Sequence, residues 1–203
     1  MFIQWCIKGV WAGPGGIDKA TANAITLGGE GLRCNWWRRQ GQPAPERVQR
    51  RLRRAELDRH VHDYDAAGPD TPFLSLTAGS VERERLLRFN RLRSAQDTAL
   101  RFATRWGRQP GFLFHCWVLV GLKPAVEIQA VAEELRELHT YTDWSDFQLE
   151  GELTAKLLVP ANQIQRWEYW DLALNPGQRL DHADNAGFQL PARLSNIRGR
   201  LGP

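Results

Sequence analysis

Two carboxylates stand two residues apart where a largely apolar segment begins. Glu150 and Glu152 precede Leu153–Val159, and Pro160 closes the segment. The segment predicts a strand, and side chains two positions apart on an extended chain leave the same face. Neighbouring carboxylates repel each other unless a cation, hydrogen bonds or a substrate holds them. The pair therefore indicates a site that stabilises positive charge, although Glu-Gly-Glu also occurs on solvated loops.

Length and composition favour one globular domain, which acts in the cytoplasm where it is made or is exported by a route that needs no cleavable signal. With 203 residues and a mean hydropathy of −0.47, the chain can bury one sizeable core. Its longest apolar runs are too short to span a bilayer, and its first residues lack the pattern of a cleavable signal peptide. Cys6, Cys34 and Cys116 form no Cys-x-x-Cys pair, so we expect buried free thiols rather than disulfides or a zinc site.

The net charge of +4 is unevenly distributed, because most of the arginines lie in the middle of the chain. The densest run extends from Arg47 to Arg54. A helix carrying this run could follow the phosphates of a nucleic acid. The acidic residues Glu46, Glu56 and Asp58 favour instead a solvated face whose charges are neutralised.

Hydrophobic periodicity predicts alternating strands and helices with no internal repeat. Strands are expected at 1–10, 32–39, 71–77, 112–120, 152–159 and 166–170. Helices are expected at 45–60, 81–93, 94–106 and 126–138, with a loop at 139–151. Val48, Leu52, Ala55 and Arg59 would form the inner stripe of the first helix. From residue 175 the chain is expected to be a basic tail on the surface or partly disordered.

Three motifs between about residue 36 and residue 171 resemble those of the mono-ADP-ribosyltransferases of the cholera and pertussis toxin type. The Glu-Gly-Glu strand, with Pro160 and a polar turn after it, resembles that family's Glu-x-Glu element. Phe73-Leu-Ser75-Leu-Thr77 resembles its Ser-Thr-Ser strand, with Leu76 in place of the middle Thr. Trp37-Arg38, followed by two prolines and Glu46, resembles its first motif, in which an aromatic residue and Arg lie on a strand.

The resemblance implies a fold and a division of the chain. The fold is a single α+β domain with a split mixed β-sheet and flanking helices around an NAD cleft. Residues 1–35 would be an N-terminal extension packed on the core. Residues 36–174 would be the catalytic core, and residues 175–203 a C-terminal tail.

The resemblance also implies how NAD is held and cleaved. Breaking the nicotinamide–ribose bond leaves positive charge on the ribose, which a fixed carboxylate stabilises in the transition state. Glu152 takes that role by resemblance, and Ser75 orients it by a hydrogen bond. Arg38 would grip the NAD phosphates with its planar fork, with Arg39 as its competitor, and Thr77 belongs to the same NAD-binding set.

By the same resemblance, the other carboxylate of the pair, Glu150, binds the acceptor of the ADP-ribosyl group. In the family, Glu at the position of Glu150 goes with arginine acceptors, because a carboxylate must anchor the guanidinium that becomes the nucleophile. Tyr141, Trp144 and Phe147, in the loop before it, would contact the acceptor. Aromatic side chains there also suit stacking on a base, which keeps nucleic acid as an alternative.

The resulting prediction is an NAD-dependent mono-ADP-ribosyltransferase that acts as a bacterial toxin, effector or defence enzyme. NAD is its substrate, protein arginine its acceptor, and NAD hydrolysis a side activity. We expect an immunity or antitoxin partner, no membrane and no metal, since His60 and His62 would supply only half of a metal site. The alternatives are ADP-ribosylation of RNA or DNA bases, and a basic nucleic-acid-binding protein without catalysis.

Overall fold

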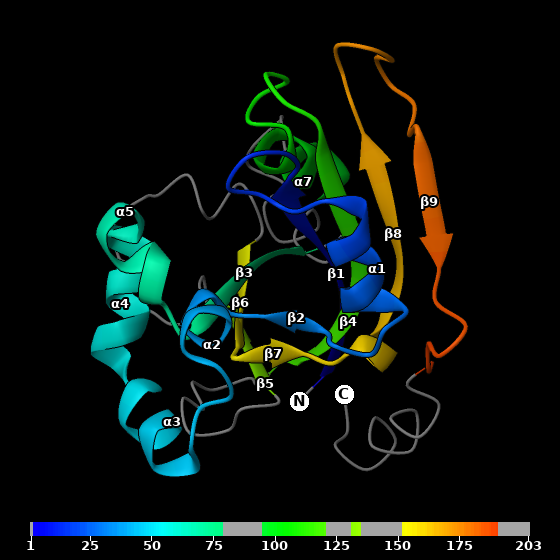
Figure 1. Ribbon diagram of the computed structural model, residues 1–203. Helices are drawn as coiled ribbons and strands as arrows, with labels where there is room; N and C mark the ends of the chain where they lie inside the picture. The colour runs from blue at the N-terminus through cyan, green and yellow to red at the C-terminus, as the bar shows by residue number, and fades with distance from the viewer. Residues whose placement is uncertain (1, 79–94, 121–130, 135–151, 191–203) are drawn as a thin grey trace.

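Seven strands form one mainly antiparallel sheet that closes on itself through five of them (Figure 1). The computed structural model describes residues 2–78, 95–120, 131–134 and 152–190. The sheet order is β1-β3-β6-β5-β4-β8-β9, and β1 also pairs with β4. The strands are Phe2–Trp11 (β1), Phe73–Ala78 (β3), Gly111–Val120 (β4), Val131–Glu134 (β5), Glu152–Lys156 (β6), Ile164–Trp170 (β8) and Asp181–Asp184 (β9). The pairing of β4 with β5 is parallel, so the expected α+β class with a mixed sheet is confirmed.

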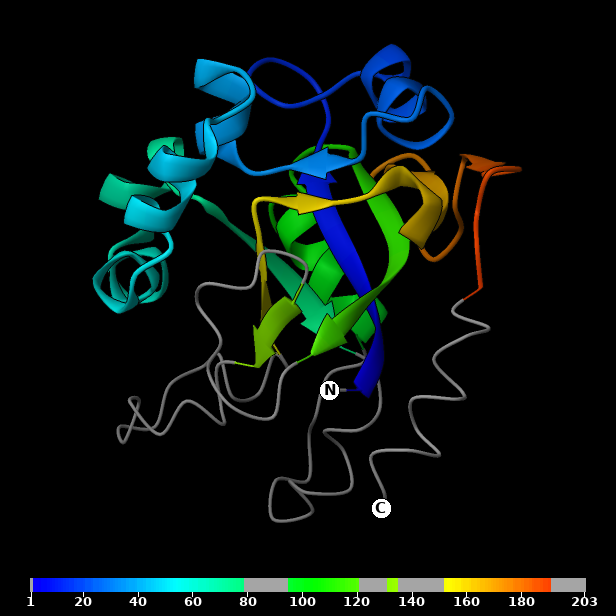
Figure 2. The same cartoon turned by 90° about the horizontal axis from the view of Figure 1, so that it is seen from below.

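A second, two-stranded sheet lies across one end of the closed strands, as Figure 2 shows. It consists of β2, Leu32–Arg33, and β7, Leu158–Val159. The predicted strand at 152–159 is therefore divided between two sheets. Leu157, at the division, has a φ of 62° and a fully buried side chain.

The helices lie around the sheet, and most of them are in the first third of the chain (Figure 1). They are Lys19–Thr26 (α1), Asn35–Gln40 (α2), Pro45–Arg51 (α3), Arg54–His62 (α4), Tyr64–Ala67 (α5) and Ala95–Ala103 (α7), with 3-10 turns at Gly68–Asp70 and Ala161–Gln163. None of the helices in the described residues is long and apolar enough to cross a membrane.

Helix α7 packs closely on the sheet because glycines face it. A Cβ on Gly9 of β1 would lie 2.3 Å from the carbonyl oxygen of Ala99. A Cβ on Gly111 of β4 would lie 2.2 Å from that of Ala103. Only glycine allows so close an approach of helix and strand backbones. This contact holds the second half of α7 against the sheet, where Ala99 and Phe102 border the cleft described below.

The main core lies between the sheet and the elements from α1 to α4. Its largest buried side chains include Trp36, Phe73, Phe112 and Trp167. Cys6, Cys34 and Cys116 are buried free thiols, as expected from their spacing. The sulfur atoms of Cys6 and Cys116, opposite each other on β1 and β4, are 3.5 Å apart.

The first strand belongs to the sheet itself. Residues Phe2–Trp11 pair with β4 over the whole length of β1, and Cys6 and Ile7 pair with β3. The segment 1–35, expected to be an extension packed on the core, thus supplies a strand between β3 and β4. The basic tail expected from residue 175 likewise contributes β9, which pairs with β8.

The predicted strand at 32–39 is wrong beyond Arg33, because a helix begins there. The thiol of Cys34 accepts a hydrogen bond from the backbone N–H of Trp37 at 3.5 Å and so caps α2. Gly41, with a φ of 76°, ends the helix. Trp36 is buried, while Arg38 is exposed on the helix. The Trp-Arg pair therefore lies on a helix rather than on a strand.

The predicted helix at 45–60 is interrupted, because α3 ends at Arg51 and α4 starts only at Arg54. Val48 and Leu52 are buried as expected, but Ala55 and Arg59 are exposed. The interruption rotates α4 so that Leu57, His60 and Val61 face the core instead.

The predicted helix at 126–138 is also wrong where the structure describes it. Residues Val131–Glu134 form β5, which pairs in parallel with β4 and antiparallel with β6. Pairing with two neighbouring strands outweighs the local helical pattern. The predicted helix at 81–93 and loop at 139–151 lie outside the described residues, and so do Glu150, Tyr141, Trp144 and Phe147.

Candidate functional site

A basic cleft of about 680 Å³ lies beside β3, between the sheet and the helices α1, α2, α4, α5 and α7. Its volume falls within the range of about 300–1,000 Å³ that is usual for small-molecule sites. Four basic residues line it, together with two acidic ones: Lys8, Arg33, Arg38, Arg105, Glu30 and Asp65. A diphosphate or another anionic group suits such a lining.

Strand β3 brings two of the predicted site residues to this cleft. Ser75 and Thr77 both line it, two positions apart. Strand β6 runs antiparallel beside them, with Thr154 opposite Ser75 and Glu152 opposite Thr77. The register therefore brings the start of β6 next to the part of β3 that lines the cleft. The start of β6 is the end of that strand that carries Glu152.

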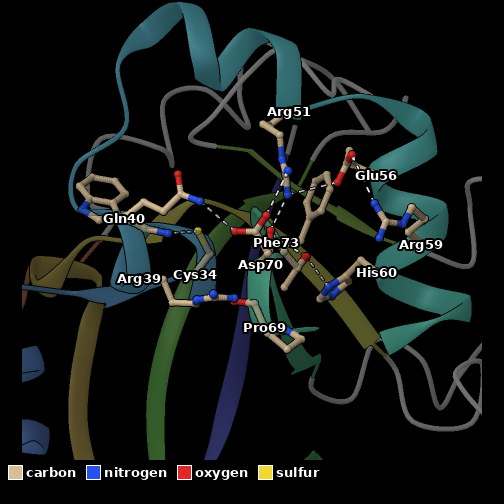
Figure 3. A network of polar contacts seen from close by, with 12 residues as sticks. Cys34, Arg39, Gln40, Arg51, Glu56, Arg59, His60, Pro69, Asp70 and Phe73 are labelled. Carbon is tan, nitrogen blue, oxygen red and sulfur yellow. Dashed lines mark hydrogen bonds and ion pairs between the residues drawn. The ribbon is translucent and has the colours of Figure 1, made fainter. Parts of the chain in front are cut away.

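A histidine that the sequence did not assign to this site contacts Ser75. The Nε2 atom of His60, on α4, is 2.9 Å from the Ser75 hydroxyl. Its Nδ1 atom is 2.8 Å from the hydroxyl of Thr71, and Figure 3 shows this ring beside Phe73. The sequence signal was present, because His60 follows Leu57 by three positions and so belongs to a buried stripe. A buried imidazole needs hydrogen-bonding partners, which these two hydroxyls supply.

Burial keeps this ring uncharged. Desolvation, with a smaller contribution from the nearby charge of Lys8, lowers the pKa of His60 to about 3. A neutral imidazole offers one donor and one acceptor nitrogen, so it can orient a hydroxyl on each side. His60 thus holds the Ser75 side chain in place at neutral pH without adding charge to the cleft.

An ion-pair network around Arg51 fixes the position of α4 (Figure 3). The guanidinium of Arg51 is 3.2 Å from the carboxylate of Asp70 and 3.3 Å from that of Glu56. It also stacks on Trp36, with its central carbon 5.4 Å from the ring centroid. The side chain of Gln40 donates to Asp70 at 3.3 Å. These contacts join α2, α3 and α4 to the turn that precedes β3, and so they set where His60 meets Ser75.

The two neighbouring arginines on α2 differ in their surroundings. Arg38 lines the cleft. The guanidinium of Arg39 donates to the backbone carbonyl of Pro69 at 3.3 Å, as Figure 3 shows, and is not among the cleft residues. Lys8, on β1, is a further basic residue of the cleft, and its charge acts on His60.

The predicted site residues thus fall into three groups. Ser75, Thr77 and Arg38 line one cleft, and Glu152 opens the strand beside it. Glu150 and the three aromatic residues of the loop lie outside the described residues. Within the described ranges, no three His, Cys, Asp or Glu side chains gather as a metal site requires.

Comparisons with known proteins concern the fold. No family model matches the chain, and no curated protein matches it. Among solved structures, EcPltA is similar with a TM-score of 0.45 and 10% sequence identity, over 92% of this chain and 88% of that one. A mutant of heat-labile enterotoxin is similar with a TM-score of 0.38 and 12% identity, over 91% and 75% respectively. Similarity at this level assigns no role to any residue of this chain.

Proposed function

We propose that this protein is an NAD-dependent mono-ADP-ribosyltransferase whose NAD substrate occupies the basic cleft. The observation that carries the proposal is the register of β3 and β6. It aligns Thr77 with Glu152, two positions from Ser75, at a cleft lined by four basic residues. This arrangement combines what NAD cleavage requires, namely cations for a diphosphate and a carboxylate for a developing ribosyl cation.

The basic residues suit the diphosphate of NAD. Arg38 and Arg33 offer planar forks that bind two phosphate oxygens at once, and Lys8 offers a point charge. We assign diphosphate binding to Arg38 and Lys8, since they lie on α2 and β1 respectively and both line the cleft. Arg39, whose guanidinium donates a hydrogen bond to the backbone carbonyl of Pro69, takes no part in diphosphate binding.

Glu152 acts on the bond that breaks. The bond between the nicotinamide nitrogen and the ribose carbon opens, and its electron pair leaves with nicotinamide. The ribose then carries positive charge, which the Glu152 carboxylate stabilises until the acceptor forms the new bond and releases a proton. Ser75 positions that carboxylate, and His60 in turn positions Ser75 through their 2.9 Å contact.

The acceptor that the sequence favours is a protein arginine. Its guanidinium would be held by Glu150, and Tyr141, Trp144 and Phe147 would contact the surrounding chain. RNA or DNA bases are the second candidate, and the exposed arginines and aromatic rings at one end of the cleft favour them. Water as acceptor gives the NAD glycohydrolase side activity. We place the enzyme in the cytoplasm of the producer or of a target cell, as a bacterial toxin, effector or defence enzyme that an immunity or antitoxin protein restrains.

Transfer of a label from NAD tests this function. The purified protein is incubated with NAD labelled in its adenylate part and with a bacterial lysate, and the products are treated with protease or with nuclease. Label on a macromolecule is expected, and the treatment that removes it identifies the acceptor class. A lysate with neither labelled macromolecule nor released nicotinamide contradicts the proposal.

A further inference from the structure

The turn that follows α7 presents aromatic and basic side chains at one end of the cleft. Phe102 is 46% exposed and Trp106 is 66% exposed, and their ring centroids are 5.8 Å apart in an edge-to-face arrangement. The guanidinium of Arg105 lies over the indole ring of Trp11, at the end of β1. Trp11, Phe102 and Arg105 all line the cleft. We call the group Trp11, Phe102, Arg105 and Trp106 the rim platform.

The backbone holds the rim platform in an unusual conformation. Arg105 and Trp106 have φ values of 47° and 59°, in the left-handed region that side chains other than glycine rarely adopt. Thr104 ties the turn to α7, because its hydroxyl donates to the carbonyl of Leu100 at 2.7 Å and accepts from the N–H of Gly107 at 3.0 Å. A bulky residue in this conformation, with an exposed ring, is the kind of strain that is found at functional sites.

The charge around the rim platform is positive. Arg101 and Arg108 are exposed beside it. Among the described residues, no carboxylate lies within 4 Å of the guanidinium groups of Arg101, Arg105 or Arg108 as an ion pair. This differs from the helix α4 region, where Arg51, Arg54 and Arg59 are paired with acids. The rim platform therefore presents the exposed rings of Phe102 and Trp106, beside guanidinium groups that form no ion pair within the part of the chain that the structure describes.

We propose that the rim platform binds single-stranded nucleic acid and leads it to the cleft. Each nucleotide supplies a flat base, which stacks on exposed aromatic rings, and a phosphate, which pairs with arginine. An acidic peptide would satisfy the arginines but not the rings. A duplex would expose phosphates while its bases remain stacked on each other. The inference rests on the proposed function for the reaction, and it deepens that function by favouring the second acceptor class, nucleic acid, over the protein arginine that the sequence favours.

Oligonucleotide binding tests the inference without NAD. A fluorescein-labelled mixed-sequence RNA of about 12 nucleotides, the DNA of the same sequence and both duplexes are titrated with the protein, and anisotropy is measured. Tighter binding of the single strands than of the duplexes is expected. Equal or tighter duplex binding overturns the proposal. So does binding of phosphatidylserine vesicles or of polyglutamate, at matched ionic strength, in place of the single strands.

Variants locate the binding. Trp106→Ala should weaken single-strand binding at least about fivefold, the loss of one stacked base, with little change in salt dependence. Changing both Arg101 and Arg108 to Gln should lower the slope of log K against log salt by about 1.4, two phosphate contacts on a single strand. Trp5→Ala, which removes another exposed indole, and Arg53→Gln, which removes another exposed arginine, are the matched controls. Equal losses in the controls overturn the location.

Two further readouts separate this inference from the proposed function. Circular dichroism must show that the Trp106→Ala protein is folded, and it should still hydrolyse NAD to nicotinamide. Glu152→Gln should bind the single strands as wild type does. A protein that binds the strands but never cleaves NAD supports the rim platform and contradicts the transferase. A protein that cleaves NAD but does not bind the single strands supports the transferase and contradicts the proposal for the rim platform.

Discussion

At the scale of single residues, Ser75 and His60 show what a sequence pattern can and cannot identify. Ser75 is assigned by the resemblance of its strand to the Ser-Thr-Ser motif, and both Ser75 and Thr77 line the cleft. His60 was considered as half of a metal site, but its two ring nitrogens are engaged by the hydroxyls of Thr71 and Ser75. These contacts join residues 11 and 15 positions apart, and no local pattern indicates which hydroxyls a buried histidine will meet.

The neutral state of His60 leads to a prediction of how the stability of the fold depends on pH. Its pKa is about 3 in the fold against 6.5 for the unperturbed group, so acid favours the unfolded chain, which binds the proton first. Between pH 6.5 and pH 3 this residue should cost about 1.4 kcal/mol of stability per pH unit as the pH falls. Urea unfolding of wild type and His60→Gln at pH 7, 6 and 5 measures it. The variant should lose less stability on acidification, and parallel losses contradict the assignment.

The basic residues of the cleft make a second prediction at this scale. Arg38→Ala and Lys8→Ala should each weaken NAD binding about tenfold, because each removes a charge-assisted contact to a phosphate. Arg39→Ala should change it far less, since its guanidinium donates to the carbonyl of Pro69. Calorimetric titration of the three variants with NAD measures the ranking. A larger effect at Arg39 than at Arg38 would mean that the NAD phosphates lie outside the cleft.

At the scale of elements, predictions from local sequence patterns were wrong where tertiary contacts determine the secondary structure. The strands at 71–77, 112–120 and 166–170 were predicted close to their observed bounds, because their apolar runs are long and bounded by turns. The helix α2 was missed, since its cap is the unusual thiol of Cys34. Strand β5 was predicted as helix, since its pairing with β4 and β6 cannot be inferred from its own sequence.

Strand β8 carries a buried carboxylate that the sequence did not single out. Glu168 on β8 is 4% exposed. It accepts hydrogen bonds from Arg166 and Arg179, each at 2.9 Å, and from the indole N–H of Trp170 at 3.1 Å. Burial opposes its ionisation, but the ring of His115, whose Nε2 atom lies 3.3 Å from the carboxylate, and the hydrogen bonds from Arg166 and Trp170 outweigh this effect and hold the pKa of Glu168 well below its usual range.

Glu168→Gln should therefore lower the free energy of unfolding by about 2 kcal/mol at pH 7. Breaking a buried ion pair costs about 3–5 kcal/mol, and the partial exposure of both arginines reduces that figure. Because the carboxyl pKa is depressed in the fold, the difference from wild type should shrink as the pH falls below 4.5. Urea unfolding gives the values, with the exposed Glu46→Gln as control. A Glu168 variant as stable as the control would show that the network contributes nothing.

At the scale of the whole molecule, the closed sheet brings together segments that are far apart in the chain. The cleft combines Lys8 of β1, Arg38 of α2 and Ser75 of β3, and β6 adds Glu152 beside Thr77. Resemblance to family motifs predicted most of these residues. It gave no reason to include Lys8, whose segment was expected to be an extension packed on the catalytic core. Topology, which depends on long-range pairing, supplies that placement.

Glu150 distinguishes the two acceptor classes for the molecule as a whole. If it anchors a guanidinium, Glu150→Gln should lose transfer to arginine and retain much of the NAD hydrolysis, because Gln keeps the size but not the charge. If the acceptor is a base bound through the rim platform, the same change should be tolerated. Transfer of labelled ADP-ribose to an arginine-rich protein and to single-stranded RNA, measured side by side, decides between them.

The central claim is that the carboxylate at the start of β6 stabilises the positive charge that forms on the ribose as the nicotinamide–ribose bond breaks. Glu152→Gln keeps the shape of the side chain and removes its charge, which should lower the rate of nicotinamide release from NAD by about 10²–10³. The measurement is nicotinamide release by the purified wild type, Glu152→Gln and the control Glu46→Gln, at saturating NAD, with folding verified for each. Nicotinamide release should be lost in Glu152→Gln alone. Nicotinamide release by Glu152→Gln within a few-fold of wild type would contradict it.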